Sequence, residues 1–484
     1  MATETGLVKM FFFPFIGGGH QIPMIDTARV FASHGAASTI IATPSHALNF
    51  QNLITRAQSS GHPITIHTLP AEIRDATDVT AGPMTDTTVL LQPLKTFLLR
   101  HPPDCIVIDM FHRWAGDLVD ELRIPRIVFT GNGCFPRCVQ ENIRKYLNLE
   151  NLSSDYEPFV VPNLPDKVEL TKSQLPIFAR NPSLFPDKMK DFEDKSFGTI
   201  INSFYELEPD YADYMRNELG KKAWIVGPVS LCNRSVEDKT QRGKLPTIDD
   251  QGCLKWLNSK EPHSVIYVCF GSLIRLPPQQ LKEIAYGLEA SGKSFVWVVG
   301  KIMKSSPKNK EEDDEDDVQT WLPEGFEERM KESNRGLIVR GWAPQLLILE
   351  HGAIGGFVTH CGWNSTLEGI CAGVPMVTWP VTAEQFLNEK LVTSVLRIGV
   401  PVGSREWVWF RDEWKEVVGR EMVEIAVKKL MGESEEAAEM RMRVKKIAES
   451  GTRAVEEGGT SYQDVDALIQ ELQERKVNNC NGEV

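Results

Sequence analysis

The sequence predicts an α/β protein that contains two parallel β-sheets. Short apolar runs typical of buried strands alternate with segments of helical length through both halves of the chain. A strand, a helix and a second strand in this order form a right-handed unit whose two strands are parallel. The segment 233–250 between the halves is charged, is interrupted by glycine and proline and has no hydrophobic period, which is typical of a linker. A length of 484 residues fits two or three domains of about 150 residues each.

The first half begins with a predicted strand at residues 7–13. Gly17, Gly18 and Gly19 then indicate a turn, and a helix is expected at residues 22–33 with Pro23 in its first turn. Further strands are predicted at residues 38–43, 64–69, 105–110, 126–130, 199–203 and 224–226, and further helices at residues 47–57, 89–99 and 115–122. Residues 148–195 are rich in Pro, Asn, Ser and Asp, so we expect an excursion from the sheet of the kind that shapes a substrate pocket.

The second half repeats the alternation. Strands are predicted at residues 264–270, 295–299, 356–359 and 376–379, and helices at residues 279–290, 421–431, 435–449 and 462–472. Residues 360–363 indicate a tight turn into a short helix that starts near Asn364 and is ended by Gly373 and Pro375. The acidic run 311–317 is interpreted as a solvated loop, although its D-x-D-like spacing also occurs in metal sites.

Composition narrows the class of protein. The chain is 42% hydrophobic and 25% charged, as in ordinary globular proteins, and its net charge of −13 argues against a nucleic-acid partner. Its nine cysteines show no C-x-x-C spacing, which favours buried thiols in a reducing compartment over a disulfide framework or a zinc site. The apolar run 10–16 is too short to cross a membrane and lacks a basic flank and a cleavage site. We therefore expect a cytoplasmic protein without stable membrane insertion.

A candidate binding site lies at the predicted turn 360–363. The turn places a helix N-terminus at the carboxyl end of a parallel strand, where an α/β protein binds an anion. Four polar side chains crowd this position: His360, Asn364, Ser365 and Thr366. Ser365 and Glu368 also fit a capping box, in which they would only satisfy N–H groups of their own helix.

Neighbouring residues favour a ligand over simple capping. A nucleotide sugar needs a flat apolar face for its base, an acceptor for the ribose diol, donors for the diphosphate and paired polar groups for the sugar hydroxyls. Trp342 and Gln345 precede the turn, and the pair Glu384 and Gln385 follows it. Residues 342–385 therefore meet all four requirements of a nucleotide-sugar site.

Two further candidates follow strands of the first half. His20 comes just after the first predicted strand, where it serves either as a general base or as a helix cap. Asp109 ends the apolar run 105–108, and a buried carboxylate requires a partner. Such a carboxylate would orient the imidazole of His20 and stabilise its protonated form. A dinucleotide-binding fingerprint is excluded, because Ile22 stands where its third glycine would be.

Residues 342–385, WAPQLLILEHGAIGGFVTHCGWNSTLEGICAGVPMVTWPVTAEQ, closely resemble the signature (PSPG) box of plant family 1 UDP-sugar glycosyltransferases. The resemblance implies a GT-B fold, in which two Rossmann-like doubly wound domains face each other across a cleft. It implies an acceptor-binding domain at residues 1–232, a linker at 233–252, a UDP-sugar-binding domain at 253–455 and a C-terminal helix at 456–484 that crosses back to the first domain.

The same resemblance implies a role for each matching residue. His20 and Asp109 would form the catalytic pair, and Trp342, Ala343 and Gln345 would hold uracil and ribose, with Glu368 accepting from the ribose hydroxyls. The diphosphate and sugar would contact Ser272, His360, Asn364, Ser365, Trp363, Thr130, Glu384 and Gln385. Transfer would invert the anomeric centre without a metal ion or other cofactor, and Gln385 resembles the residue found in glucose users, which makes UDP-glucose the expected donor.

Motifs of the first half indicate the class of acceptor. The motifs GGGHQIPMIDTARVFASHGA, PPDCIVIDMFHRWAGD and IPRIVFTGNGCF resemble legume enzymes of triterpenoid saponin biosynthesis, a branch of plant specialised metabolism, with isoflavonoid glucosyltransferases as near relatives. Phe15, Phe111, Trp114 and Phe135 are candidates for an apolar pocket wall, or else ordinary core residues. A flavonoid glucosyltransferase, a catalytically silent UDP-sugar-binding protein and a metal-dependent transferase are the alternatives. A monomer is expected.

Overall fold

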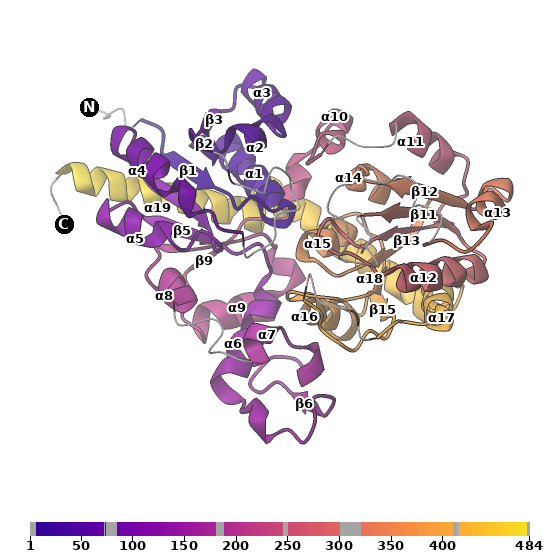
Figure 1. Cartoon of the computed structure of the whole chain (residues 1–484). Coiled ribbons are helices and arrows are strands. Elements are labelled where there is room, and N and C mark those ends of the chain that lie inside the picture. The colour runs from indigo at the N-terminus through magenta and orange to yellow at the C-terminus, as the bar shows by residue number, and fades with distance from the viewer. Residues whose placement is uncertain are drawn as a thin grey trace. The chain divides into compact units, whose positions relative to one another are not determined.

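The computed structural model describes residues 6–71, 73, 85–180, 188–244, 250–300, 321–409, 414 and 416–481 of the chain (Figure 1). Contacts divide the chain into two compact units. The first comprises Met1–Cys138, Asn181–Lys244 and Ser450–Val484, and the second comprises Val139–Arg180 and Leu245–Glu449. The expected domain boundaries remain a prediction, and the units differ from them chiefly because residues 139–180 group with the second unit.

The first unit is built on a seven-stranded sheet with the order β3-β2-β1-β4-β5-β8-β9, and all its strand pairs are parallel. The strands are β1 (Lys9–Phe13), β2 (Ala37–Ala42), β3 (Ile64–Thr68), β4 (Cys105–Asp109), β5 (Arg126–Phe129), β8 (Gly198–Ile201) and β9 (Ala223–Ile225). Because Phe13 pairs with Ile108, β1 and β4 end at the same edge of the sheet. The predicted parallel sheet is therefore confirmed for this unit.

The helices of the first unit alternate with its strands, and they include several that the sequence did not predict. They are α1 (Gly18–Ser33), α2 (Pro44–Leu48), α3 (Gln51–Ser59), α4 (Leu91–Arg100), α5 (Ala115–Glu121), α6 (Cys134–Tyr146, which continues into the second unit), α8 (Lys188–Asp194), α9 (Pro209–Asn217), α10 (Val236–Thr240) and α19 (Thr460–Asn481). The expected turn at Gly17–Gly19 is wrong, because α1 begins at Gly18 and includes Pro23 beyond its first turn. Packing thus overrides the low helix propensity of glycine.

The second unit is built on a six-stranded sheet with the order β12-β11-β10-β13-β14-β15, again parallel throughout. The strands are β10 (Val265–Cys269), β11 (Ser294–Val299), β12 (Gly336–Arg340), β13 (Ile354–Thr359), β14 (Met376–Thr378) and β15 (Gly399–Pro401). The helices are α7 (Ile177–Arg180), α11 (Asp250–Asn258), α12 (Pro278–Ser291), α13 (Phe326–Glu332), α14 (Gln345–Leu349), α15 (Trp363–Cys371), α16 (Gln385–Lys390), α17 (Arg420–Leu430) and most of α18 (Glu435–Ala454). A short antiparallel pair, β6 (Pro158–Val160) and β7 (Glu169–Thr171), completes this unit.

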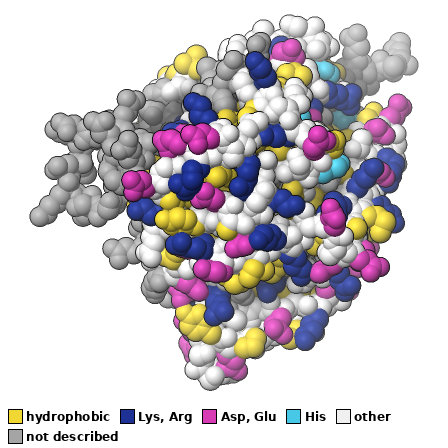
Figure 2. Space-filling view, turned by 90° about the vertical axis from the view of Figure 1, so that its right-hand side faces the viewer, with side chains coloured by type: hydrophobic (Ala, Val, Ile, Leu, Met, Phe, Trp, Pro, Cys, Tyr) yellow, Lys and Arg dark blue, Asp and Glu magenta, His cyan; other side chains and the backbone are white. Residues whose placement is uncertain are grey.

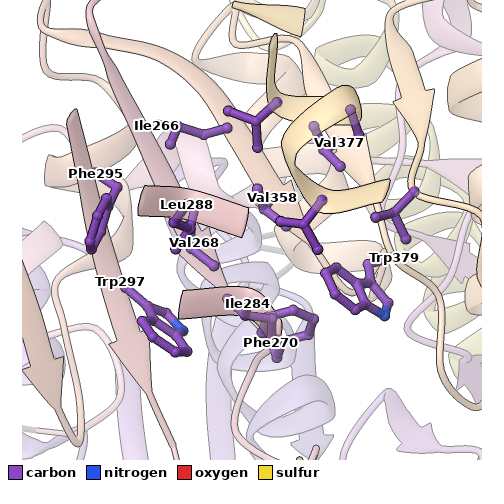
Figure 3. Close-up of a cluster of buried hydrophobic side chains, with 14 of the residues drawn as sticks. Ile266, Val268, Phe270, Ile284, Leu288, Phe295, Trp297, Val358, Val377 and Trp379 are labelled. Carbon is purple, nitrogen blue, oxygen red and sulfur yellow. The ribbon is translucent and has the colours of Figure 1, made fainter. Parts of the chain in front are cut away.

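The core of the second unit lies between its sheet and helices (Figure 3). Ile266, Val268 and Trp297 on the strands meet Leu288 of α12, and each is fully buried. Each large apolar side chain removed from water in this way stabilises the fold by about 1.5–3 kcal/mol. The strand β13 is buried along its whole length, which is why its sequence is apolar without alternation.

The described surface and side chains bear on the expected partners. On the face drawn in Figure 2, lysine and arginine side chains are interspersed with aspartate and glutamate, so neither charge dominates there. None of the described helices has the length and hydrophobicity that a bilayer crossing requires. Over the described ranges no group of His, Cys, Asp or Glu is arranged to hold a metal ion, and none of the eight described cysteines takes part in a disulfide bond. The acidic run 311–317 lies outside the described residues.

Candidate functional site

His20 and Asp109 form a hydrogen-bonded pair in the first unit. His20 lies in the first turn of α1 and Asp109 is the last residue of β4, so both follow the carboxyl edge of the sheet. Nδ1 of His20 lies 2.8 Å from Oδ2 of Asp109, and the other carboxylate oxygen accepts the N–H of Phe111 at 3.0 Å. The Asp109 side chain is fully buried, whereas the His20 side chain is 23% exposed. This geometry fixes a proton on Nδ1 and leaves Nε2 as the basic nitrogen.

Close approach of a glycine and two aromatic rings sets the position of the His20 ring. Gly131 has a φ of +72°, and a Cβ atom there would lie 3.1 Å from Cε1 of His20. The rings of Phe111 and Phe15 lie 4.7 and 6.4 Å from the imidazole, measured between centroids. Gly131 was missed by the sequence analysis, and a glycine just past the end of the predicted strand 126–130 was the available signal.

His112 forms a second polar cluster that the sequence analysis also missed. Its Nε2 lies 3.1 Å from the carbonyl oxygen of Pro14 and therefore donates, so its Nδ1 accepts from the hydroxyl of Thr87 at 2.9 Å. The indole N–H of Trp114 donates to the same hydroxyl oxygen at 2.9 Å. Burial lowers the pKa of His112 to about 4, so this imidazole is neutral near pH 7. It supports the segment that leads from β1 to His20.

The four acceptor-wall candidates differ in exposure. Phe15 and Phe135 are fully buried, and Phe111 and Trp114 are half-buried. Phe135 stacks edge-on against Tyr211, and its N–H donates to the buried carboxylate of Glu208, which also accepts from the N–H of Cys134. Desolvation raises the pKa of Glu208. Phe135 is thus packed at the start of α6, whereas Phe111 lies against His20.

In the second unit, the turn before α15 presents His360. The capping-box interpretation of Ser365 and Glu368 is wrong, because Gly362 is the N-cap of α15 and makes no side-chain cap. Cys361 has a φ of +62°, and a Cβ atom at Gly271 would lie 2.6 Å from Cε1 of His360. Nδ1 of His360 is buried and has no hydrogen-bond partner among the described residues. Burial lowers the pKa of His360 to about 4, so it acts as a neutral group.

Gln345 organises the next part of this site. Its amide nitrogen donates to the carboxylate of Glu368 at 2.7 Å and lies 3.1 Å from the hydroxyl of Ser365. Its oxygen accepts from the hydroxyl of Tyr267 at 3.3 Å. Glu368 is 4% exposed, so its carboxylate is buried and already hydrogen-bonded. Tyr267 was not among the sequence candidates because an aromatic residue inside a strand indicates only packing.

Glu384 and Gln385 lie at the start of α16. Oε1 of Gln385 accepts the backbone N–H groups of Val381 and Thr382, both at 2.9 Å, so its amide nitrogen is the group left for a ligand. Nδ2 of Asn388 lies 3.3 Å from Glu384 and donates to the carbonyl of Cys361 at 2.9 Å. Asn388 therefore connects the turn that carries His360 with the acidic residue of this pair.

The remaining candidates also follow strands of their own unit. Trp342 is half-buried and Ala343 is buried just after β12, Ser272 follows β10, and Trp363 is buried at the start of α15. Thr130 follows β5 in the first unit, and its buried hydroxyl has no partner among the described residues. Cys269 pairs with Thr359 and Thr359 with Thr378, so β10, β13 and β14 end together. The structure thus gathers the candidates of the second unit at one sheet edge.

Comparison with known proteins identifies the class. Residues 246–400 match the family model described as UDP-glucoronosyl and UDP-glucosyl transferase. The chain is 64% identical over 478 residues to abscisate beta-glucosyltransferase of Phaseolus angularis, covering 98% of this chain and 99% of the relative. It is 48% identical to UDP-glucose flavonoid 3-O-glucosyltransferase 7 of Fragaria ananassa, with 98% of each chain covered. The chain therefore belongs to the UDP-glycosyltransferase family.

Solved structures agree on the fold. Glycyrrhiza uralensis UGT73P12, complexed with glycyrrhetinic acid 3-O-monoglucuronide, has a TM-score of 0.90 and 39% identity over 99% of this chain and 98% of its own. Medicago truncatula UGT71G1, complexed with UDP-glucose, has a TM-score of 0.79 and 26% identity over 98% of this chain and 100% of its own. The chain is a UDP-glycosyltransferase with the GT-B fold, as the sequence predicted.

Proposed function

We propose that the chain transfers glucose from UDP-glucose, with inversion, to an oxygen of a small lipophilic plant metabolite. The observation that carries this proposal is the 2.8 Å contact between Nδ1 of His20 and the buried carboxylate of Asp109. A silent UDP-sugar-binding protein would have no use for a base that is oriented in this way.

The base acts on the acceptor. When the acceptor is a hydroxyl, Nε2 of His20 removes its proton while Asp109 stabilises the imidazolium that forms. The acceptor oxygen attacks the anomeric carbon from the face opposite UDP, the bond to the diphosphate oxygen breaks, and the configuration inverts. A positioned general base contributes about 10²- to 10⁴-fold to the rate of such a step.

The leaving diphosphate is met by groups of the chain. The N-terminus of α15 carries a partial positive charge, and the neutral imidazole of His360, two residues before the N-cap Gly362, supplies a hydrogen-bonding nitrogen. Trp342 stacks on uracil, Glu368 accepts from the ribose, and Glu384 with the amide nitrogen of Gln385 binds the sugar hydroxyls. We therefore propose that transfer needs no metal ion.

Three acceptor classes have specific support. Abscisate, a carboxylic acid, ranks first because the relative from Phaseolus angularis, 64% identical, is named for it. A triterpenoid ranks second, because the structure at a TM-score of 0.90 holds a triterpenoid glucuronide. The sequence motifs favoured the triterpenoid, and flavonoid acceptors are supported by the relative from Fragaria ananassa.

Product analysis by mass spectrometry tests this assignment. Purified protein is incubated with UDP-glucose, EDTA and, separately, abscisate, triterpenoid and flavonoid acceptors. We expect a hexose adduct in the presence of EDTA, with the highest kcat/KM for abscisate. Loss of the adduct on chelation would contradict metal independence, and adducts on flavonoids or triterpenoids alone would contradict the ranking.

Transfer to a carboxylate and transfer to a hydroxyl can be distinguished by removing the base. A carboxylic acid with a pKa of about 4 is already ionised near pH 7, so it needs no base, whereas a hydroxyl does. We expect His20→Ala to reduce transfer to hydroxyl acceptors by about 10²-fold or more and transfer to abscisate by less. Equal losses for both acceptors would show that His20 acts by positioning.

A further inference from the structure

Residues 404–408 form a segment that runs beside the loop carrying Glu384 and Gln385. The segment follows β15 in the second unit. The hydroxyl of Ser404 donates to the carbonyl of Pro380 at 2.9 Å, and the N–H of Val408 donates to the carbonyl of Val381 at 2.8 Å. Two hydrogen bonds thus fix the start of the loop 380–385.

Trp407 fixes the other end of this loop. Its indole N–H donates to the carbonyl oxygen of Ala383 at 2.9 Å, and its side chain is buried. Ala383 has a φ of +50°, a left-handed backbone conformation that is unfavourable for a residue with a Cβ atom. A residue held in this conformation needs support from its surroundings. Because Ala383 directly precedes Glu384, the bond from Trp407 sets where the pair Glu384 and Gln385 points.

The opposite edge of the segment is held by residues 155–180. The backbone N–H of Trp407 donates to the carbonyl of Ser173 at 2.9 Å, and the hydroxyl of Ser173 donates to the carbonyl of Arg405 at 2.9 Å. Arg180 donates to the same Ser173 carbonyl at 2.6 Å, and its guanidinium lies 5.9 Å from the ring centroid of Trp407. The hydroxyl of Tyr156 donates to Glu406. Trp407 is therefore held on both sides.

We propose that Trp407 is a positioning residue for the donor sugar and that it acts through the carbonyl of Ala383. This inference rests on the proposed function, in which Glu384 and Gln385 bind the sugar hydroxyls. It assigns Trp407 to the sugar moiety alone, since uracil, ribose and diphosphate are held by residues after other strands. The affinity for UDP-glucose should therefore depend on Trp407, and the affinity for UDP should not.

Trp407→Phe removes the indole N–H and keeps an aromatic ring in the pocket. Its matched control is Trp379→Phe, because Trp379 is 1% exposed in the same unit and its indole nitrogen has no hydrogen-bond partner among the described residues. Dissociation constants of UDP-glucose and UDP are measured by calorimetry on the full chain. We expect Trp407→Phe to raise the dissociation constant of UDP-glucose by roughly tenfold and that of UDP by less than about twofold. Trp379→Phe should leave the ratio of the two constants unchanged.

Glu384→Ala separates failure of this inference from failure of the proposed function. If Glu384→Ala changes the ratio and Trp407→Phe does not, the inference is wrong and the sugar site stands. If neither variant changes the ratio, the loop does not bind the sugar, and the inference is wrong as well. If Trp407→Phe does not fold, as judged by circular dichroism, Trp407→Met, which also lacks the indole N–H, is used. An unchanged ratio in that variant overturns the inference, and a ratio shifted in the same direction by about threefold supports it.

Discussion

At the scale of single residues, the chemistry depends on which proton each buried group holds. His20 and His112 both lie near the carboxyl end of β1 or β4, yet their partners differ. Asp109 places a carboxylate on Nδ1 of His20, whereas His112 faces a carbonyl and a hydroxyl and is neutral. The carboxylate therefore marks His20 as the base, and residue type alone does not distinguish the two histidines.

Asp109→Asn tests this assignment of protons. The amide keeps the shape of the carboxylate but does not stabilise the imidazolium, and it can hold the imidazole in the wrong tautomer. We expect kcat with a hydroxyl acceptor to fall by about 10³- to 10⁴-fold, while the dissociation constant of UDP stays the same. Initial rates and calorimetry measure the two quantities. A rate within tenfold of the original enzyme would show that Asp109 is only structural.

Glu389 gives a prediction about stability and pH. It is buried in α16, its carboxylate accepts from the hydroxyl of Thr378 at 2.7 Å, and desolvation raises its pKa to about 7 from 4.5. Between these values unfolding releases a proton, so the contribution of Glu389 to stability falls as the pH rises through this window. Above about pH 7 the buried charge is a constant cost on the order of 3 kcal/mol.

Glu389→Gln removes that charge and is expected to raise Tm relative to the original protein at pH 8 and to raise it less at pH 5. Thermal unfolding at both pH values measures the difference. Glu449→Gln on the exposed face of α18 is the control. A Tm difference for Glu389→Gln that is the same at both pH values would mean that Glu389 does not bind a proton in this range.

At the scale of elements, the turn between β13 and α15 depends on the close approach of Gly271 to His360. Gly271 has a φ of +72° and leaves no room for a Cβ atom beside His360, whereas Gly292 has a φ of +73° and an open surrounding. Substitution by alanine therefore strains both backbones, and it displaces the imidazole only at Gly271.

Gly271→Ala and Gly292→Ala form a matched pair for this element. Each is expected to reduce stability by about 1–2 kcal/mol through its backbone. Gly271→Ala should also weaken UDP binding by roughly tenfold or more, because His360 loses its position, and Gly292→Ala should leave it unchanged. Calorimetric titration with UDP decides the matter. Equal UDP affinities in the two variants would remove His360 from the diphosphate site.

The elements also show what sequence can predict. Parallel strands end at one edge of a sheet, so the positions of His20 and Asp109 after two such strands predicted that the two residues form a pair. The structure has this contact. The predicted start of α1 was wrong because glycines indicate a turn unless packing stabilises them in a helix. The strand β15 was missed because it has three residues, including glycine and proline, and strand propensity is weak there. Asn388 and Trp407 were missed because their contacts are set by tertiary structure.

At the scale of the whole molecule, each unit is stabilised by segments distant in sequence. Residues 450–484 belong to the first unit, where α19 packs on β9. Asp464 accepts from the N–H of Ile225 and from Arg216, both at 2.7 Å, and the hydroxyl of Ser461 donates to the carbonyl of Gly227 at 2.6 Å. The two ends of the described chain therefore contribute to one folding unit.

Leu468→Ala tests the contribution of α19. Leu468 is fully buried, and its truncation should reduce the free energy of unfolding of the first unit by about 2–5 kcal/mol. Gln470→Ala on the exposed face of the same helix is the control, with a change of less than about 0.5 kcal/mol expected. Thermal unfolding measures both variants. A Leu468→Ala protein as stable as the control would show that the packing of α19 does not stabilise the unit.

In the proposed mechanism His20, oriented by Asp109, is the base for glucosyl transfer to an acceptor hydroxyl. The most direct measurement compares initial rates of hexose transfer from UDP-glucose to one hydroxyl acceptor for the original enzyme and for His20→Ala, with the UDP affinity of both determined in parallel. We expect the rate to fall by about 10²-fold or more while the UDP affinity is unchanged. A variant that transfers glucose at the original rate would contradict this mechanism.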